Sequence, residues 1–397
     1  RRALAALYQG PRNDTRRAER EYSAARAQGV RDAARLERIG DAASDNGNSD
    51  QAIRAYSEAL ERAPDSPQLH YKLGRAYQER GRVAAAVEEQ QRALALTESP
   101  PTAELAALRA SALIALGDLA RERGNLAEAN SYYGQALQID GTRVPAQIGL
   151  GLAAVGQGNW GVAHGYFETA AGMPGGEASA EAQFWLAESL LRRGDLTGAT
   201  RRYNDALALD GDFPEAYLGL AQTRYAQGDS AAALETVNAG LRQRPNYAEA
   251  LLFKGKLLQE SGRFDEALTA YNQSIAASTR IAETYYRRGV LHIQRADYDQ
   301  AVSDLGRAAR LQPNFPEAAY WLGRAYYAQG RLEQALSAFR DAVSYNANYT
   351  DAIFYSGLVA EDLGRTAEAI SAYQTVIQID AGGDLAARAR VQLDRLT

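Results

Sequence analysis

Small and apolar residues recur along this chain with a period of 34 residues. Each copy holds an alanine, a large residue four positions later and a small residue three positions after that, which places all three on one face of a helix. Neighbouring alanines are 34 residues apart except for one gap of 43 and one of 36. Self-similarity at a period of this size predicts stacked supersecondary units rather than one globular core. The alanines are Ala18, Ala52, Ala86, Ala129, Ala163, Ala199, Ala233, Ala267, Ala301, Ala335 and Ala369.

Two columns of glycine predict how each unit is built. The first column lies five residues before the alanine, where a left-handed glycine ends a helix and turns the chain back; Asn13 and Ala296 are its exceptions. The second column lies seven residues earlier, inside a helix, where glycine costs up to about 1 kcal/mol relative to alanine. We therefore expect two helices to pack closely at that level. The second column comprises Gly40, Gly74, Gly117, Gly151, Gly255, Gly289, Gly323 and Gly357, with Ala187 and Ala221 in the remaining copies.

This pattern resembles that of the tetratricopeptide repeat family. The resemblance rests on the small–aromatic–small helix face, the paired glycines, the 34-residue period and the prolines that close three copies, Pro64, Pro245 and Pro313, and it covers nearly the whole chain. It implies an all-α fold, namely a right-handed superhelical solenoid of antiparallel helix pairs. Members of this family usually bind a partner protein or peptide along the concave face.

The repeats divide the chain into consecutive segments. We expect a degenerate or partial N-terminal repeat over 1–32, two repeats over 33–100, and two more over 101–177. Pro100, Pro101 and Thr102 precede an uninterrupted helical stretch, so the first helix of that third segment is expected to be about two turns longer than its counterparts. Six repeats over 178–383 and a capping helix over 384–397 complete the chain.

Composition narrows the range of partners and locations. The net charge of −5 argues against nucleic-acid binding, which needs a basic surface. The absence of cysteine excludes disulfides and thiolate metal sites. The sequence contains no run of 18 apolar residues, which is about the length that a helix needs to span a membrane. The chain begins at Arg1 rather than at methionine, so a signal peptide or an anchor has been removed or the end has been trimmed. We expect an exported or cell-envelope location rather than a cytoplasmic one, with membrane contact only through a removed N-terminal segment.

No group of residues suggests catalysis. His70, His164 and His292 fall in three different repeats and cannot share a metal ion. Serine, histidine and acidic residues do not combine into a nucleophilic arrangement. We therefore expect a non-enzymatic protein with no catalytic residue, no cofactor, no metal and no small-molecule substrate.

The first helix of each repeat presents a face that should line the groove of the solenoid. This face is polar in the first repeats and becomes apolar from Ile148 onward. Two interpretations stand: these side chains pack between neighbouring helices, or they form a partner groove, since tyrosine and arginine often anchor interfaces. The residues of the predicted partner groove are Tyr225, Leu252, Tyr286, Val290, Ile293, Tyr320, Arg324, Tyr327, Phe354 and Leu358.

Acidic residues recur at the start of the later first helices. Acids in a first turn stabilise a helix through its dipole by about 0.3–1 kcal/mol each. Alternatively, they form an acidic rail along the groove that selects a basic partner segment. The residues of this acidic rail are Glu215, Glu249, Glu283, Glu317 and Asp351.

Three functions are compatible with this sequence. The first is a protein–protein interaction scaffold that binds an extended or helical partner segment in the groove. The second is a self-assembling structural scaffold, in which repeat arrays build an oligomer. The third is an accessory subunit that regulates an enzyme complex. Repeat folds serve unrelated processes, so the fold does not choose among them.

Overall fold

The structure is a computed structural model that describes residues 33–98 and 102–396. The described residues form 21 α-helices and no strand, which confirms the all-α prediction. The degenerate repeat expected over 1–32 lies outside the described residues. The chain divides into two compact units, Arg1–Gly211 and Asp212–Thr397.

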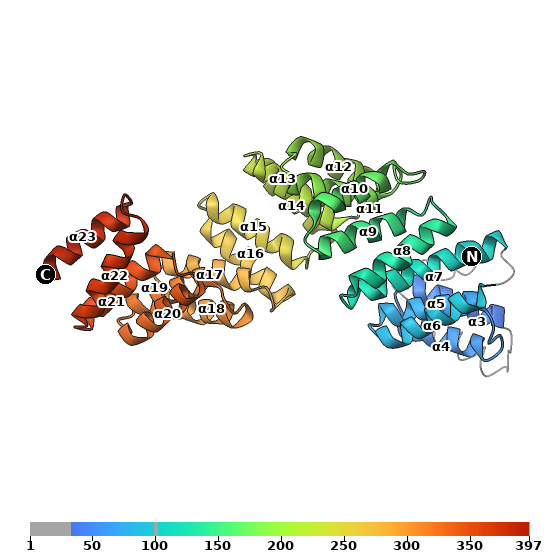
Figure 1. The fold of residues 1–397 in the computed structure, drawn as a ribbon, viewed down its shortest axis with the longest axis horizontal. Coiled ribbons are helices and arrows are strands. Elements are labelled where there is room, and N and C mark those ends of the chain that lie inside the picture. Colours follow the sequence, from blue (N-terminus) through green and yellow to red (C-terminus); the bar gives the residue numbers. More distant parts are fainter. Residues whose placement is uncertain (1–32, 99–101, 397) are drawn as a thin grey trace. The chain divides into compact units, whose positions relative to one another are not determined.

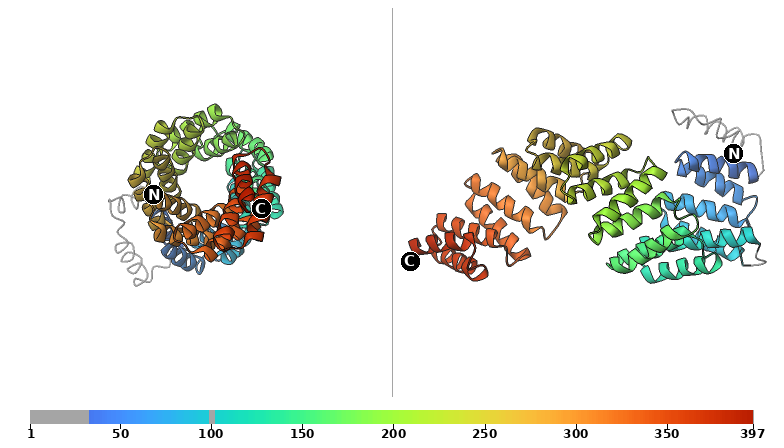
Figure 2. Two further views of the ribbon diagram at one scale, coloured as in Figure 1. Left: turned by 90° about the vertical axis from the view of Figure 1, so that its left-hand side faces the viewer. Right: turned by 90° about the horizontal axis from the view of Figure 1, so that it is seen from above.

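Five antiparallel helix pairs form the first unit (Figures 1 and 2). These pairs are α3 (Ala33–Asp45) with α4 (Ser49–Leu60), α5 (Pro67–Glu79) with α6 (Val83–Leu96), α7 (Ala103–Glu122) with α8 (Leu126–Ile139), α9 (Val144–Gly156) with α10 (Trp160–Gly172), and α11 (Ala180–Arg192) with α12 (Leu196–Leu209). Helix α7 has 20 residues where α5 and α9 have 13, and the Thr102 hydroxyl caps it by accepting a hydrogen bond from the Leu105 amide at 3.2 Å.

Five further pairs and a single last helix form the second unit (Figure 1). The pairs are α13 (Pro214–Ala226) with α14 (Ser230–Gln243), α15 (Ala248–Glu260) with α16 (Phe264–Ala277), α17 (Ala282–Gln294) with α18 (Tyr298–Leu311), α19 (Pro316–Ala328) with α20 (Leu332–Tyr345), and α21 (Thr350–Asp362) with α22 (Thr366–Ile379). The last helix, α23 (Asp384–Leu396), buries Ala386 and Ala389 and thereby covers apolar surface on the final pair.

The first helix of each pair belongs to the inner layer of its unit. Each first helix packs on its own second helix, and neighbouring first helices touch from α5 to α11 in the first unit and from α15 to α21 in the second. The exposed faces of the first helices therefore form one continuous surface in each unit. We call this surface the first-helix face.

The interior glycines allow the two helices of a pair to approach. A Cβ atom on Gly117 would lie 2.5 Å from Cε1 of Tyr133, closer than real Cβ atoms come to any neighbour. A Cβ atom on Gly323 would likewise lie 2.7 Å from Cδ1 of Phe339. The close packing that the sequence predicts at this level is therefore present, and the ring of the second helix occupies the space that a side chain would fill.

The turn glycines adopt the expected left-handed backbone. Gly330, for example, has φ of 71°. Ala296, one of the two exceptions noted in the sequence, adopts the same conformation with φ of 59° although it carries a Cβ atom. The turn geometry is thus fixed by the fold, and alanine tolerates it there at a cost in backbone strain.

Candidate functional site

The predicted partner groove lies on the first-helix face of the second unit. Its members come from the same positions of α13, α15, α17, α19 and α21. Eight of the ten side chains are half-buried, whereas two are buried. The half-buried ones are Tyr225, Leu252, Tyr286, Val290, Ile293, Arg324, Tyr327 and Leu358.

Tyr320 and Phe354 are the two buried members. Tyr320 is 6% exposed and its ring centroid lies 5.2 Å from that of Tyr349. Phe354 is 1% exposed and its centroid lies 5.8 Å from that of Tyr373. Both rings are too buried to contact a partner. We therefore assign Tyr320 and Phe354 to packing between neighbouring helices, which is the first of the two interpretations given for the groove residues.

Arg324 lies among aromatic rings. Its guanidinium carbon is 4.2 Å from the centroid of Tyr355 and 5.5 Å from that of Trp321, and its Nη1 donates a hydrogen bond of 2.8 Å to the hydroxyl of Tyr320. Cation–π contacts of this kind hold the charge in place. The sequence reasoning missed Trp321, Tyr349 and Tyr355. Trp321 and Tyr355 directly follow a groove residue, and that adjacency is the signal that could have found them.

Two other members carry polar contacts at the surface. The hydroxyl of Tyr327 donates a hydrogen bond of 2.8 Å to Oδ2 of Asp362. Desolvation, followed by the hydrogen bond to the Asp362 carboxylate, raises the pKa of Tyr327 to about 12. The ammonium of Lys256 lies 4.4 Å from the ring centroid of Tyr225. These contacts orient the two tyrosines, and both side chains remain half-buried.

Two of the five acidic-rail residues form ion pairs within the chain. Glu215 forms an ion pair with Arg244 at 2.6 Å, and Glu283 forms one with Arg287 at 2.6 Å. Glu249 and Glu317 are exposed and form no ion pair within 4.0 Å with any described residue. Asp351 is half-buried.

The first-helix face of the first unit holds a half-open pocket of about 230 Å³. It opens between four successive first helices, and polar and apolar side chains share its lining. Within it, Asp118 accepts a hydrogen bond of 2.7 Å from the hydroxyl of Tyr133, and burial raises the pKa of the Asp118 carboxyl. The lining residues are Gln78, Asp118, Arg121, Glu122, Pro145, Ile148, Gly149, Leu152 and Glu181.

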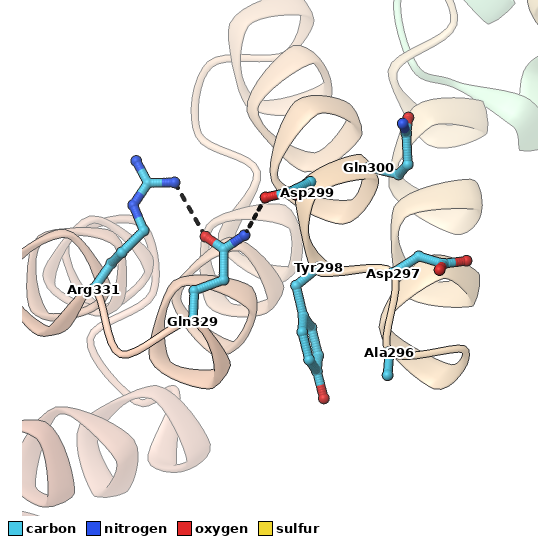
Figure 3. A pocket seen from close by; sticks show the side chains of 7 residues that line it. All are labelled: Ala296, Asp297, Tyr298, Asp299, Gln300, Gln329 and Arg331. Carbon is cyan, nitrogen blue, oxygen red and sulfur yellow. Dashed lines mark hydrogen bonds between the residues drawn. The ribbon is translucent and has the colours of Figure 1, made fainter.

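A second pocket, of about 790 Å³, lies at the turns of the second unit (Figure 3). Gln329 connects two neighbouring turns, since its Nε2 donates to Asp299 at 2.7 Å and its Oε1 accepts from Arg331 at 3.1 Å (Figure 3). Asp297, Tyr298, Gln300 and Ala296 complete the lining (Figure 3). These hydrogen bonds show that the pocket lies where two neighbouring turns contact each other. We assign no ligand to it.

No group of three or more potential ligands within the described residues could hold a metal ion. Among the helices of residues 33–98 and 102–396, none is both long and apolar enough to span a bilayer.

Comparison with known families gives matches along most of the chain. Three family models described as tetratricopeptide repeat match it. The first covers residues 37–104, 148–217, 286–352 and 331–384, the second 190–257, and the third 110–143 and 248–279. None of the curated proteins compared with the chain matches it.

Several solved structures are similar to this chain. The Cut9–Hcn1 hetero-tetramer of the APC/C gives a TM-score of 0.53 at 14% identity, over 91% of this chain and 87% of that one. The pilF protein of Pseudomonas aeruginosa gives 0.50 at 18% identity, over 54% and 97%. YrrB, described as a TPR protein with an unusual peptide-binding site, gives 0.44 at 20% identity, over 49% and 100%. The family matches extend over more than half of the residues, and this chain belongs to the tetratricopeptide repeat family.

Proposed function

We propose that the first-helix face of the second unit binds a segment of a partner protein. The family supports a general role as a protein–protein interaction scaffold without enzymatic activity. The observation that carries the more specific proposal is a strip of seven half-buried apolar and aromatic side chains contributed by five successive first helices. We call it the C-terminal strip, and it comprises Tyr225, Leu252, Tyr286, Val290, Ile293, Tyr327 and Leu358.

The residue types in the C-terminal strip suit this role. A contiguous apolar surface on a repeat array marks an interaction site, because covering it removes apolar area from water. Tyrosine adds a hydroxyl at the edge of an apolar ring, which suits the boundary between a buried contact and solvent. Tyr225 and Tyr327 are already oriented by Lys256 and Asp362, so little side-chain entropy is lost when a partner covers them.

The charges beside the C-terminal strip suggest the flanks of the partner segment. Glu249 and Glu317 are exposed members of the acidic rail and form no ion pair with any described residue. They lie at the starts of α15 and α19, where the helix dipole already favours a negative charge. An apolar partner segment with basic flanking residues would match this surface, and the exposed charges would act mainly on its rate of association.

The proposal is tested by comparing two triple variants of the full chain. The first, Tyr225→Ala with Val290→Ala and Tyr327→Ala, removes contacts from α13, α17 and α19. The matched control, Phe264→Ala with Tyr345→Ala and Ile379→Ala, removes exposed apolar side chains from the second helices α16, α20 and α22. Each variant must keep the helical circular dichroism of the wild type.

Both variants and the wild type are used to capture proteins from a lysate of the source organism. A protein that the wild type and the control capture is then purified and its affinity for each chain is measured directly. We expect the first variant to lose at least tenfold in affinity and the control to match the wild type. Equal affinities for all three chains would refute the proposal.

A further inference from the structure

Two cations lie at equivalent positions of the first-helix face in the second unit, and their surroundings differ. Lys256 and Arg324 each follow an interior glycine directly, and both are half-buried. The ammonium of Lys256 lies 4.0 Å from Oε1 of Glu260, four residues further along the same helix. The residue four positions after Arg324 is Ala328, and Arg324 forms no ion pair within 4.0 Å with any residue of the two described ranges. No carboxylate of those residues therefore neutralises its charge.

Aromatic side chains hold the Arg324 guanidinium and leave one of its edges without a hydrogen-bond partner among the described residues. Its carbon lies 4.2 Å from the ring centroid of Tyr355, and Nη1 donates to the hydroxyl of Tyr320 at 2.8 Å. Nε and Nη2 donate to no described residue, yet neither is a fully buried nitrogen, unlike Nε of Arg121. This edge therefore meets solvent. Its two donors lie side by side in one plane, which matches the two oxygens of a carboxylate.

A partner that covers the C-terminal strip also covers this edge of Arg324. Val290 of α17 and Leu358 of α21 occupy the same position as Arg324 in the repeats before and after it, and both belong to the strip. A segment that runs over the strip from α17 to α21 therefore displaces water from Nε and Nη2. Because a buried cation without an acceptor is costly, the segment has to supply both an oxygen acceptor and a negative charge at this point.

We propose that Arg324 selects partner segments that carry an aspartate or glutamate side chain, whose carboxylate accepts hydrogen bonds from Nε and Nη2. This inference rests on the proposed function, since it names a residue required in the segment that covers the C-terminal strip. The strip continues on both sides of Arg324, so the carboxylate belongs to a side chain within the segment and not to a chain end.

The basic flanks proposed for the segment are compatible with this central acid. Glu317 precedes Arg324 by seven residues of α19, which corresponds to about 10 Å along a helix. The acidic rail and the guanidinium therefore contact different parts of the segment.

The inference is tested with peptides, so that the natural partner need not be known. A phage library of random 12-residue peptides is selected on the full wild-type chain, on Arg324→Gln and on Arg340→Gln. Arg340 is the matched control because it is an exposed arginine on the second helix α20. Arg324→Lys is a further variant, which keeps the charge and loses the paired donors. Helical circular dichroism is compared for all four chains.

We expect peptides selected on the wild type and on Arg340→Gln to share an acidic residue at one place in an apolar stretch. Peptides selected on Arg324→Gln should lack it. One wild-type peptide is then synthesised with an amidated C-terminus, as selected and with its acid replaced by the corresponding amide. The replacement should raise the Kd at least tenfold for the wild type and Arg340→Gln, and less than twofold for Arg324→Gln. Arg324→Lys should bind the acidic peptide more weakly than the wild type does.

The outcomes separate this inference from the proposed function. Peptides that bind the strip are those that lose affinity for the variant with Tyr225→Ala, Val290→Ala and Tyr327→Ala. If such peptides share no acid, or if the amide replacement acts equally on the wild type and Arg324→Gln, the inference is overturned and the proposed function stands. A peptide that binds only with a free C-terminal carboxylate also overturns it. If no selected peptide loses affinity for the triple variant, the proposed function fails, and this inference fails with it.

Discussion

The ring of Tyr133 lies directly against the backbone of Gly117, so that a Cβ atom there would be 2.5 Å from Cε1 of the ring. The same ring atom would lie 2.5 Å from a Cβ atom on Gly149 of the next first helix. One buried tyrosine thus fills the gap that two glycines leave in two neighbouring helices. This relationship explains why an unfavourable helix residue recurs at this level of the repeat.

Gly117→Ala should therefore destabilise the protein. Overpacking of this kind costs about 1–3 kcal/mol, and it outweighs the gain of up to about 1 kcal/mol in helix propensity. The measurement is the free energy of unfolding in urea, followed by circular dichroism. Gly134→Ala in α8 is the matched control because a Cβ atom there would meet nothing within 4 Å, and it should be neutral or stabilising. If both substitutions stabilise the protein equally, the packing explanation is wrong.

Ala296→Gly should stabilise the protein by about 1 kcal/mol, because alanine in the left-handed conformation is strained and glycine is not. The opposite substitution at the equivalent turn, Gly330→Ala, should destabilise by a similar amount, since Gly330 has φ of 71°. Thermal unfolding of the two single variants provides the test. A fall in Tm for Ala296→Gly would contradict the strain that we assign to this turn.

Arg288→Ala should cost about 3–5 kcal/mol of stability, because it leaves a buried carboxylate without its cation. The Asp304 residue is 5% exposed, and two guanidinium nitrogens of Arg288 donate to its oxygens at 2.7 Å each. Arg340→Ala removes the partner of Glu368 in an exposed ion pair and should change stability by less than about 1 kcal/mol. Similar losses from both substitutions, measured in urea, would argue against burial as the deciding factor.

Tyrosine ionisation should limit stability at alkaline pH. The pKa of Tyr327 is raised to about 12 in the folded chain, above the value near 10 of an unfolded one. The folded state therefore favours the neutral phenol, and the stability that this residue contributes is complete below pH 10 and is lost as the pH rises toward 12. Tyr327→Phe should reduce the fall in Tm between pH 8 and pH 11. An identical fall in the wild type and the variant would show that Tyr327 is not linked to folding.

The fold was largely predictable because its determinants are local and repeated. The alanine, ring and glycine columns each encode a contact between adjacent helices, such as Gly323 with Phe339, and the periodicity displays that contact many times. Helix ends were predictable for the same reason, and even Ala296 retains the turn of its glycine counterparts.

The site was less predictable because side-chain exposure depends on more than repeat position. Tyr320 and Tyr286 occupy equivalent positions, and each packs against the ring that precedes the next first helix, Tyr349 at 5.2 Å and Phe315 at 5.0 Å, yet only Tyr320 is buried. The pocket beside Asp118 is lined by side chains of four successive first helices, a combination that no single repeat position encodes. Periodicity shows which residues occupy equivalent positions in the repeats. It does not show the exposure of each side chain or the position of a pocket, because both depend on neighbours that differ from repeat to repeat.

Site-specific photo-crosslinking tests the proposed contact between the C-terminal strip and a partner protein. A benzophenone amino acid replaces Tyr327 in one chain and Tyr345, an exposed tyrosine on the second helix α20, in another. Both chains are expressed in the source organism and irradiated. We predict a discrete crosslinked protein from position 327 and none from position 345. Crosslinking from position 345 alone, or the same products from both positions, would contradict the claim.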